Sequence, residues 1–337
     1  MVRMSSEHSA STRQAAMVDR FGRKIDYLRL SVTDRCDLRC TYCIPKGFRD
    51  FTEPPDWLTF DEIVRFVSVL KRRGLRHLRL TGGEPLTRRN LPDLVSRLSS
   101  LGVDDISMST NGTQLETYAK PLRLAGLSRL NVSLDSLDEQ KTAQIAGRNV
   151  LSAVLRGLEA ARAAGFGLIK VNMVVMADTN MATIEEMIEF CQKSGFVLRL
   201  IEAMPMGQTG RSAGKFDLSE LRERLRRSRY LQDVESTSGG PAKYLKSADG
   251  TITVGFITPM SDHFCSSCNR VRLTADGTMF LCLGQNDKVD FRPLLRAGRP
   301  DSELDIAIDR AMLIKPHRHD FITNPKAIDR IMAATGG

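Results

Sequence analysis

The fold of this protein is indicated by one stretch near its start, Tyr27-Leu-Arg-Leu-Ser-Val-Thr-Asp-Arg-Cys36-Asp-Leu-Arg-Cys40-Thr-Tyr-Cys43. The first six residues are typical of a short strand, and three cysteines follow in a C-x3-C-x2-C loop. A loop after the first strand of a β/α series lies at the C-terminal mouth of a barrel, where such folds place their chemistry. The stretch therefore predicts both a fold class and a reactive site.

Working outward from this stretch, short apolar strands alternate with segments of helical spacing. Thr59 and Glu62 form a capping-box pattern at the start of one helical segment. The predicted strands are Tyr27-Val32, His77-Leu80, Asp105-Thr110, Ser128-Ser133, Leu168-Val175 and Val197-Met204; the apolar helical positions are Ile63, Val67 and Leu70, then Ile184, Met187, Ile188 and Cys191. Six such units imply a parallel sheet with right-handed crossovers. We expect an α/β fold, an incomplete (β/α)6 barrel of the TIM type, with a doubly wound sheet as the alternative.

The alternation stops near Arg211, and a Ser/Gly/Pro-rich break follows at Glu235-Pro241. The predicted elements around and after the break are a basic helix at Leu218-Arg229, a strand at Thr251-Phe256, and helices at Phe291-Ala297 and Glu303-Ile314. The pattern predicts three parts: a flexible tail (1–20), a barrel (21–235) and a C-terminal region (236–337).

Composition narrows the classes of protein. Of 337 residues, 42% are hydrophobic and 26% charged, and no run of apolar residues is long enough for a membrane helix. The formal net charge of +9 points to an anionic partner. Seven cysteines in two clusters and one isolated position, with no secretory h-region before them, predict a protein of the reducing cytoplasm rather than a disulfide scaffold.

Cys36, Cys40 and Cys43 form the first triplet. Three thiolates at this spacing can bind a 4Fe-4S cluster and leave its fourth iron without a protein ligand. A zinc site and unliganded cysteines are the alternatives, although no fourth Cys or His stands nearby in the sequence.

Cys265, Cys268 and Cys282 form the second triplet, and Cys191 remains as a predicted core residue. Either this triplet binds a second 4Fe-4S cluster with an open iron, or His263 completes a Cys3His zinc site. Arg270 and Arg272 alternate along a strand, so their side chains share a face. Their forked donors suit a polyphosphate, whereas a solvated strand face is the alternative.

Several motifs together carry a family resemblance. The first triplet, with an aromatic residue before its last cysteine, resembles the signature of the radical S-adenosylmethionine (SAM) enzymes. Thr81-Gly-Gly-Glu-Pro85 after the second strand resembles their element for the SAM amino group. The string Cys265-x2-Cys-Asn-Arg-x-Arg272, the opening Tyr27-x-Arg-x-Ser and the final Gly336-Gly337 resemble the molybdenum cofactor biosynthesis protein A family, the GTP 3′,8-cyclases. Asp37 departs from that pattern, in which Asn is commoner; it is not a proposed ligand.

The resemblance implies two 4Fe-4S clusters, SAM as cofactor and GTP as substrate. It assigns SAM contacts to Tyr42, Gly83, Ser133 and Met204, with Glu84 or nearby carbonyls accepting from the ammonium group. It assigns GTP contacts to Arg29, Arg79, Thr110, Lys170, Arg270 and Arg272, and brings Gly336 and Gly337 into the same pocket. The implied reaction cleaves SAM to a 5′-deoxyadenosyl radical, which takes the ribose C3′ hydrogen so that C3′ attacks guanine C8. The second cluster would bind the purine.

The same resemblance implies a flavodoxin or ferredoxin as reductant, transfer of the product to a cyclic pyranopterin monophosphate synthase, and a possible homodimer. No membrane partner is expected, because no long apolar run is present, and no nucleic-acid partner is expected, because aromatic residues make up only 6% of the chain and no recognition motif occurs. The alternatives are a radical SAM enzyme that modifies RNA or a peptide, and a zinc or iron-sulfur protein that binds nucleic acid.

Overall fold

The computed structural model describes residues 15–214, 216–235 and 240–336. Within these ranges twelve strands form one sheet in the order β12-β11-β10-β1-β2-β3-β4-β5-β6-β9-β8-β7. The strands are β1 (Tyr27–Ser31), β2 (His77–Thr81), β3 (Asp105–Thr110), β4 (Arg129–Ser133), β5 (Ile169–Val175), β6 (Val197–Glu202), β7 (Gln232–Val234), β8 (Lys243–Lys246), β9 (Thr253–Ile257), β10 (Arg270–Leu273), β11 (Thr278–Phe280) and β12 (Lys288–Asp290).

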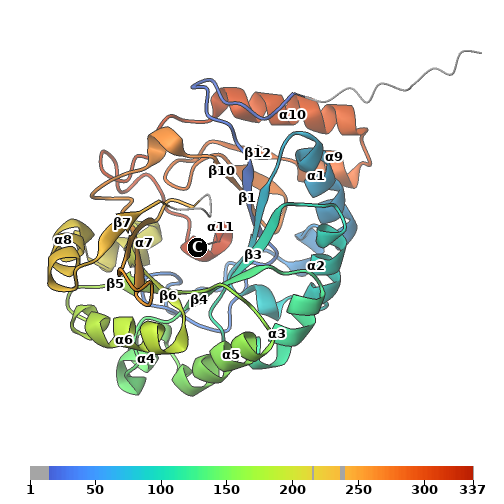
Figure 1. Cartoon of the computed structure of the whole chain (residues 1–337). Coiled ribbons are helices and arrows are strands. Elements are labelled where there is room, and N and C mark those ends of the chain that lie inside the picture. The colour runs from blue at the N-terminus through green and yellow to red at the C-terminus, as the bar shows by residue number, and fades with distance from the viewer. Residues whose placement is uncertain (1–14, 215, 236–239, 337) are drawn as a thin grey trace, which may run out of the picture.

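The strands from β10 through β1 to β6 and on to β9 pair in parallel, and the outer strands at both edges pair antiparallel. The sheet curves into an open barrel with helices around its outside (Figure 1). The predicted incomplete α/β barrel is thus confirmed. The C-terminal region adds one parallel strand at each edge, β10 beside β1 and β9 beside β6, which the sequence did not indicate. The division of the chain at residue 235 stays a prediction.

The helices follow the strands in the expected alternation. They are α1 (Phe60–Arg72), α2 (Leu91–Ser99), α3 (Leu115–Leu124), α4 (Glu139–Ala146), α5 (Leu151–Ala163), α6 (Ile184–Ser194), α7 (Gly207–Ser212), α8 (Leu218–Ser228), α9 (Arg292–Arg296), α10 (Asp301–Ile314) and α11 (Met332–Thr335). None of the helices in the described part of the chain is both long and apolar enough to cross a membrane.

The start of α1 has the predicted capping box. The Glu62 backbone amide donates to Thr59 Oγ1 at 3.2 Å, and the Thr59 amide donates to Glu62 Oε2 at 2.7 Å. These bonds satisfy donors that a helix start leaves without intrahelical partners. The predicted apolar faces of α1 and α6 are buried, and Cys191 on α6 is 2% exposed, as its core assignment requires.

Side chains along the strands alternate between the apolar core under the helices and the interior of the barrel. In β1, Leu28 and Leu30 are fully buried in the apolar cluster that joins the sheet to its helices. Arg29 between them faces the other way, because successive strand side chains point to opposite faces. The interior of the barrel is therefore polar and cationic, whereas the layer under the helices is apolar.

The last helix of the described chain lies inside the barrel. Helix α11 lies in the middle of the ring of strands (Figure 1). It packs there by Ile331 and Ala333 against Ile44, with Cys36 and Cys43 of the first triplet beside them. The C-terminal segment thus covers part of the interior that the strands enclose.

Candidate active site

The first cysteine triplet lines a cavity of about 170 Å³, the first cavity, together with residues at the C-terminal ends of the strands. Burial raises the pKa of Cys36 and of Cys43 to about 12 and raises that of Cys40 as well. The loop therefore needs added positive charge to hold thiolates. Three thiols around one cavity, with iron supplying that charge, fit the three-ligand iron-sulfur site.

All four predicted SAM-contact residues, Tyr42, Gly83, Ser133 and Met204, line this first cavity. The Tyr42 hydroxyl donates to Asp135 Oδ2 at 2.9 Å, which fixes the aromatic ring beside Cys43. A Cβ at Gly83 would come closer than 3.0 Å to the carbonyl oxygens of Asp34 and Arg35. Only glycine therefore lets the segment after β2 pass the cysteine loop at this distance.

Glu84 has a different place from the one the resemblance suggests. Its side chain is 1% exposed and does not line the first cavity. Its oxygens accept from Thr110 Oγ1 at 2.7 Å and from the backbone amides of Leu86 and Asn111 at 3.0 and 2.6 Å. Burial outweighs these donors and raises the pKa of Glu84 to about 7. Glu84 thus joins the ends of β2 and β3.

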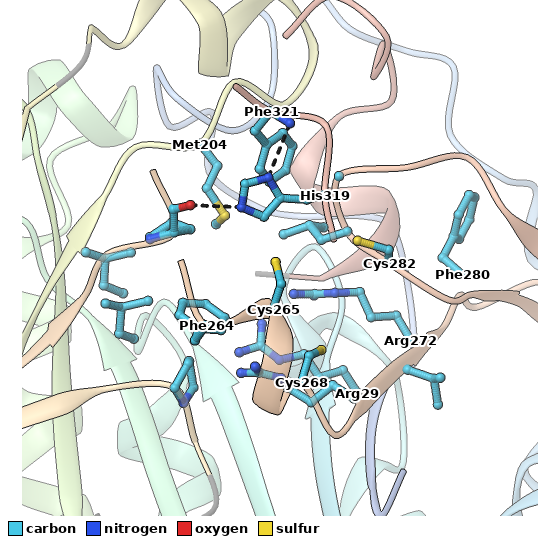
Figure 2. Close-up of a pocket in the computed structure, with 18 of the residues that line it drawn as sticks. Arg29, Met204, Phe264, Cys265, Cys268, Arg272, Phe280, Cys282, His319 and Phe321 are labelled. Carbon is cyan, nitrogen blue, oxygen red and sulfur yellow. Dashed lines mark hydrogen bonds between the residues drawn. The ribbon is translucent and has the colours of Figure 1, made fainter. Parts of the chain in front are cut away.

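The second triplet lines another cavity, the second cavity, of about 140 Å³ (Figure 2). Five arginines share its wall with the cysteines: Arg29, Arg79, Arg199, Arg270 and Arg272. Phe264, Phe280 and Phe321 add aromatic rings to its lining, at separate places around the cavity (Figure 2). A pocket with several guanidinium groups and aromatic rings can bind an anion joined to a flat ring.

Three of these arginines form one layer. Arg29 on β1 is the register partner of Arg79 on β2 and of Arg272 on β10. Burial and the neighbouring guanidinium groups lower the pKa of Arg29, and Arg29 Nε is buried without a hydrogen-bond partner. Burial and Arg270 lower the pKa of Arg272 to about 9. Like charges in adjacent strand positions repel, so this layer favours a polyanion.

Two predicted GTP contacts lie elsewhere. Thr110 lines the first cavity and donates to Glu84, so it is not beside the arginine layer. Lys170 on β5 does not line the second cavity; its Nζ donates to the Tyr244 hydroxyl at 2.9 Å. Burial and the charge of Arg199 lower the pKa of Lys170 to about 7. Arg29, Arg79, Arg270 and Arg272 are brought together as the resemblance implies.

Arg199 on β6 is a member of the cationic wall that the sequence reasoning missed. Its Nε donates to Asn172 Oδ1 at 2.8 Å and its Nη2 donates to Asn131 Oδ1. Gly255 on the neighbouring β9 makes room, since a Cβ there would lie 3.1 Å from Arg199 Cγ. The available signal was one arginine within the apolar run Val197-Leu-Arg-Leu-Ile201.

The histidines near the second triplet do not favour the zinc alternative. His263 is exposed and does not line the second cavity. His319 does line it, but Nε2 contacts the Pro259 carbonyl at 2.9 Å and Nδ1 accepts from the Phe321 amide at 3.3 Å (Figure 2). Among the described residues, no three His, Cys, Asp or Glu side chains gather at a single-ion position.

Two arginines hold the loops of the second triplet through backbone carbonyls. Arg23 Nη1 donates to the Cys265 carbonyl at 2.7 Å, and its Nε pairs with Asp19 at 2.6 Å. Arg330 Nη2 donates to the Cys282 carbonyl at 3.2 Å and to the Gln285 carbonyl at 2.8 Å. These contacts fix the thiol positions from outside the cavity.

The thiols of the second triplet differ in charge state. For Cys268, burial favours the neutral thiol, but the charges of Arg270 and Lys315 outweigh it and lower the pKa to about 7. Burial raises the pKa of Cys265 and of Cys282. The second triplet therefore has a positive electrostatic setting.

The C-terminal segment touches both cavities. Met332 and Ala333 line the first cavity, while the Thr335 and Gly336 carbonyls accept from Arg272 Nη1 in the second. Gly336 has φ +72°, and a Cβ there would lie 2.8 Å from Thr81 Oγ1. Gly337 lies outside the described residues.

The two cavities share a wall. Ser109, Asn172, Ile201 and Met204 line both of them. The two cavities are therefore adjacent.

Comparisons with known proteins agree with this arrangement. The radical SAM superfamily model matches residues 30–191, and the Molybdenum Cofactor Synthesis C model matches residues 196–321. The chain is 46% identical over 333 residues to the GTP 3′,8-cyclase of Agrobacterium fabrum, covering 96% of this chain and 95% of that protein. The chain belongs to the GTP 3′,8-cyclase family. The family member from Marinobacter nauticus is 46% identical over 330 residues, covering 96% of this chain and 99% of that protein.

A solved structure supports the fold of this GTP 3′,8-cyclase family member. Streptococcus suis SuiB bound to S-adenosylmethionine matches with a TM-score of 0.61 at 16% identity, covering 82% of this chain and 66% of SuiB. As a radical SAM protein, the chain has a 4Fe-4S cluster and SAM as the expected ligands of its first cavity.

Proposed function

We propose that this protein is a GTP 3′,8-cyclase, which converts GTP to 3′,8-cyclo-7,8-dihydro-GTP for molybdenum cofactor synthesis. The observation that carries the proposal is the shared wall between the two cavities. One cavity has a cysteine triplet and glycine-rich backbone, the other has a cysteine triplet and five arginines. This pairing suits a radical source beside a nucleotide site.

At the first site, Cys36, Cys40 and Cys43 would hold a 4Fe-4S cluster, with SAM against Tyr42, Gly83, Ser133 and Met204. When bound, the cluster supplies the electron that cleaves SAM and starts radical chemistry. The protein contributes position: Gly83 permits close approach of backbone, and the Asp135 contact holds Tyr42. The buried, enclosed setting also limits access of water and of competing hydrogen donors.

At the second site, Cys265, Cys268 and Cys282 would hold a second 4Fe-4S cluster whose open iron binds the guanine. Two observations support this assignment: both ring nitrogens of the cavity-lining His319 contact backbone groups, and His263 is exposed. The cavity would take the purine beside Phe264, which is next to the triplet in the sequence. Fixing the base in this way restricts rotation about the glycosidic bond.

The triphosphate would lie on the arginine layer. Arg29, Arg79 and Arg272 are register partners, with Arg270 and Arg199 on the same cavity wall. Guanidinium forks bind phosphate oxygens through paired donors, and their mutual repulsion is relieved by the polyanion. We also propose that Lys170 and Thr110 contribute to GTP binding. Lys170 would act through its hydrogen bond with the Tyr244 hydroxyl, and Thr110 through its hydrogen bond with Glu84.

The proposed positions of the triphosphate, the base and the ribose explain how the C3′ hydrogen would be selected. Phosphate contacts on β1, β2 and β10 and base contacts at the second triplet fix GTP at two ends. Ribose is then held toward the shared wall formed by Ser109, Asn172, Ile201 and Met204. Gly336 and, by proposal, Gly337 close the site from the barrel interior. Two-ended binding of this kind supplies orientation, the main contribution a protein makes to such chemistry.

We further infer the wider setting: action in the cytoplasm, a flavodoxin or ferredoxin as reductant, product transfer to a cyclic pyranopterin monophosphate synthase, and a possible homodimer. The family membership supports these inferences. The division into a barrel (21–235) and a C-terminal substrate region (236–337) is proposed on the same basis.

Anaerobic incubation with SAM, a reductant and GTP deuterated at C3′ tests the function. We expect methionine, deuterated 5′-deoxyadenosine and an isomer of GTP, with about eight irons per chain for two four-iron clusters. Cys36→Ala should abolish SAM cleavage, and Cys265→Ala should abolish GTP conversion while SAM cleavage persists. Cys191→Ala is the matched control and should retain both. Stoichiometric zinc without SAM cleavage, or turnover of RNA or peptide in place of GTP, would contradict the proposal.

A further inference from the structure

A buried lysine ties together the two segments that carry the second triplet. Lys315 follows α10, is 1% exposed and lines neither cavity. Its Nζ donates to the Arg270 carbonyl at 2.9 Å and to the Leu281 carbonyl. Arg270 stands two residues after Cys268, and Leu281 directly precedes Cys282. The ammonium group therefore contacts the backbone next to Cys268 and Cys282 without lining the substrate cavity.

The charge of Lys315 has no ion-pair partner among the side chains of the described residues. Its attractive electrostatic interactions are with the Cys268 and Cys282 thiols and, more weakly, with Asp19, which already pairs with Arg23. Arg23 itself repels Lys315. Burial lowers the pKa of Lys315, and the charges of Cys268 and Cys282 oppose that shift, so an anion at the second triplet favours the charged form of the amine.

The first triplet has the opposite surroundings. The charged groups that act on Cys36 are Glu84 and Asp37, and those that act on Cys40 include Asp135 and Asp37. All of these are carboxyl groups. The two triplets thus share the same donor atoms but differ in the charges that act on their thiols. Carboxyl groups act on Cys36 and Cys40, although Arg39 Nη1 donates to the Cys36 carbonyl at 2.7 Å, whereas Arg270 and Lys315 act on Cys268. Fixed charge around an iron-sulfur cluster is one of the factors that set its reduction potential.

We propose that Lys315 is the internal countercharge of the iron-sulfur cluster held by the second triplet, and that its ammonium group raises the reduction potential of that cluster. This inference rests on the proposed second cluster. A positive charge near the thiolates stabilises the more negative, reduced form relative to the oxidised one. Lys315 does not line the substrate cavity, so it is a positioning residue rather than a catalytic one.

Redox titration of the reconstituted protein, followed by electron paramagnetic resonance of each cluster, tests the inference. Lys315→Met removes the charge and both donors, whereas Lys315→Gln removes the charge and keeps an amide donor. We expect both variants to shift the potential of the second cluster to more negative values and to leave that of the first unchanged. Lys326→Met, at an exposed lysine of the same region, is the control and should match the wild type.

The outcomes separate this inference from the proposed function. Wild-type protein with only about four irons per chain would contradict both, because no second cluster would exist. Eight irons with unchanged potentials in both variants would overturn the role of Lys315 alone. A shift in Lys315→Met but not in Lys315→Gln would assign the effect to hydrogen bonding and also overturn it. If Lys315→Met loses iron, the potential measured in Lys315→Gln decides the matter.

Discussion

Arg29 and Arg272 are register partners on the parallel strands β1 and β10, so two guanidinium groups of like charge stand side by side in the barrel. Arg79 continues the row on the other side of Arg29. Burial adds to the mutual repulsion, as the lowered pKa values of Arg29 and Arg272 indicate. The repulsion lowers the free energy of unfolding of the ligand-free protein relative to a protein with a neutral row. A bound polyanion removes this loss of stability.

Arg29→Met tests this balance. We expect GTP affinity to fall about 10- to 100-fold, because a charge-assisted hydrogen bond contributes about 1.5–3 kcal/mol. The melting temperature without nucleotide should stay equal or rise, since repulsion in the row is relieved. Calorimetric titration and thermal unfolding measure the two effects. A lower melting temperature together with unchanged GTP affinity would contradict this account of the row.

Cys268 should be the most reactive thiol of the metal-free protein near neutral pH. A pKa lowered to about 7 makes about half of it thiolate at pH 7, and alkylation should quicken about tenfold from pH 6 to pH 8. Cys36 and Cys43, with pKa values raised to about 12, should stay mostly unmodified. Alkylation followed by peptide mass spectrometry measures each site. Arg270→Met should move the Cys268 profile to higher pH; an unmoved profile counts against the assigned cause.

Gly336→Ala should dislodge the C-terminal segment. The left-handed backbone at φ +72° disfavours a side chain, and the added Cβ would also crowd Thr81. We expect GTP conversion to fall about 10²-fold, because small misplacements in a site have effects of that order. Gly298→Ala is the matched control: its φ is +61°, but nothing lies within 4 Å of the added Cβ. Equal losses in both variants would show that backbone strain alone is responsible.

Arg73 should matter for stability rather than for turnover. Its side chain is 5% exposed and contacts Asp305 at 3.1 Å and Asp309 at 2.5 Å, which joins α1 to α10. Arg73→Met leaves two carboxylates without this partner, and we expect a loss of about 1–3 kcal/mol. Arg72→Met, at a more exposed pair with Asp301, should cost about 0–1 kcal/mol. Urea unfolding of the two variants compares them; similar midpoints would refute the assigned difference.

The strand and cysteine patterns could be predicted because they depend on local spacing. Each of these features is visible within a short window of sequence: the strand that begins at Tyr27, the spacing of the cysteine triplets, and the apolar faces of α1 and α6. The proposed SAM-contact positions came from the family resemblance, and the structure places all four of them in the lining of the first cavity. Glu84 was assigned less well, since its hydrogen-bond partners, Thr110 and Asn111, come from the end of the next strand.

The remaining features depend on contacts distant in sequence. Arg199 joins the cationic wall beside Gly255 on β9, where an added Cβ would lie 3.1 Å from Arg199 Cγ. Lys315 belongs to the second site because α10 ends next to Arg270 and Leu281, a relation with no sequence signal. The sequence also gives no sign that β10 pairs with β1. Chemistry carried by such pairings appears only when the sheet is assembled.

The pairing of β1 with β10 also has a consequence for biosynthesis. About 240 residues separate the two strands, so at about 5–20 residues per second the ribosome needs roughly 10–50 s to deliver the partner of β1. During that interval one edge of β1 presents unpaired backbone groups next to the cysteine loop. The nascent chain therefore passes through a state prone to association until β10 covers this edge of the barrel.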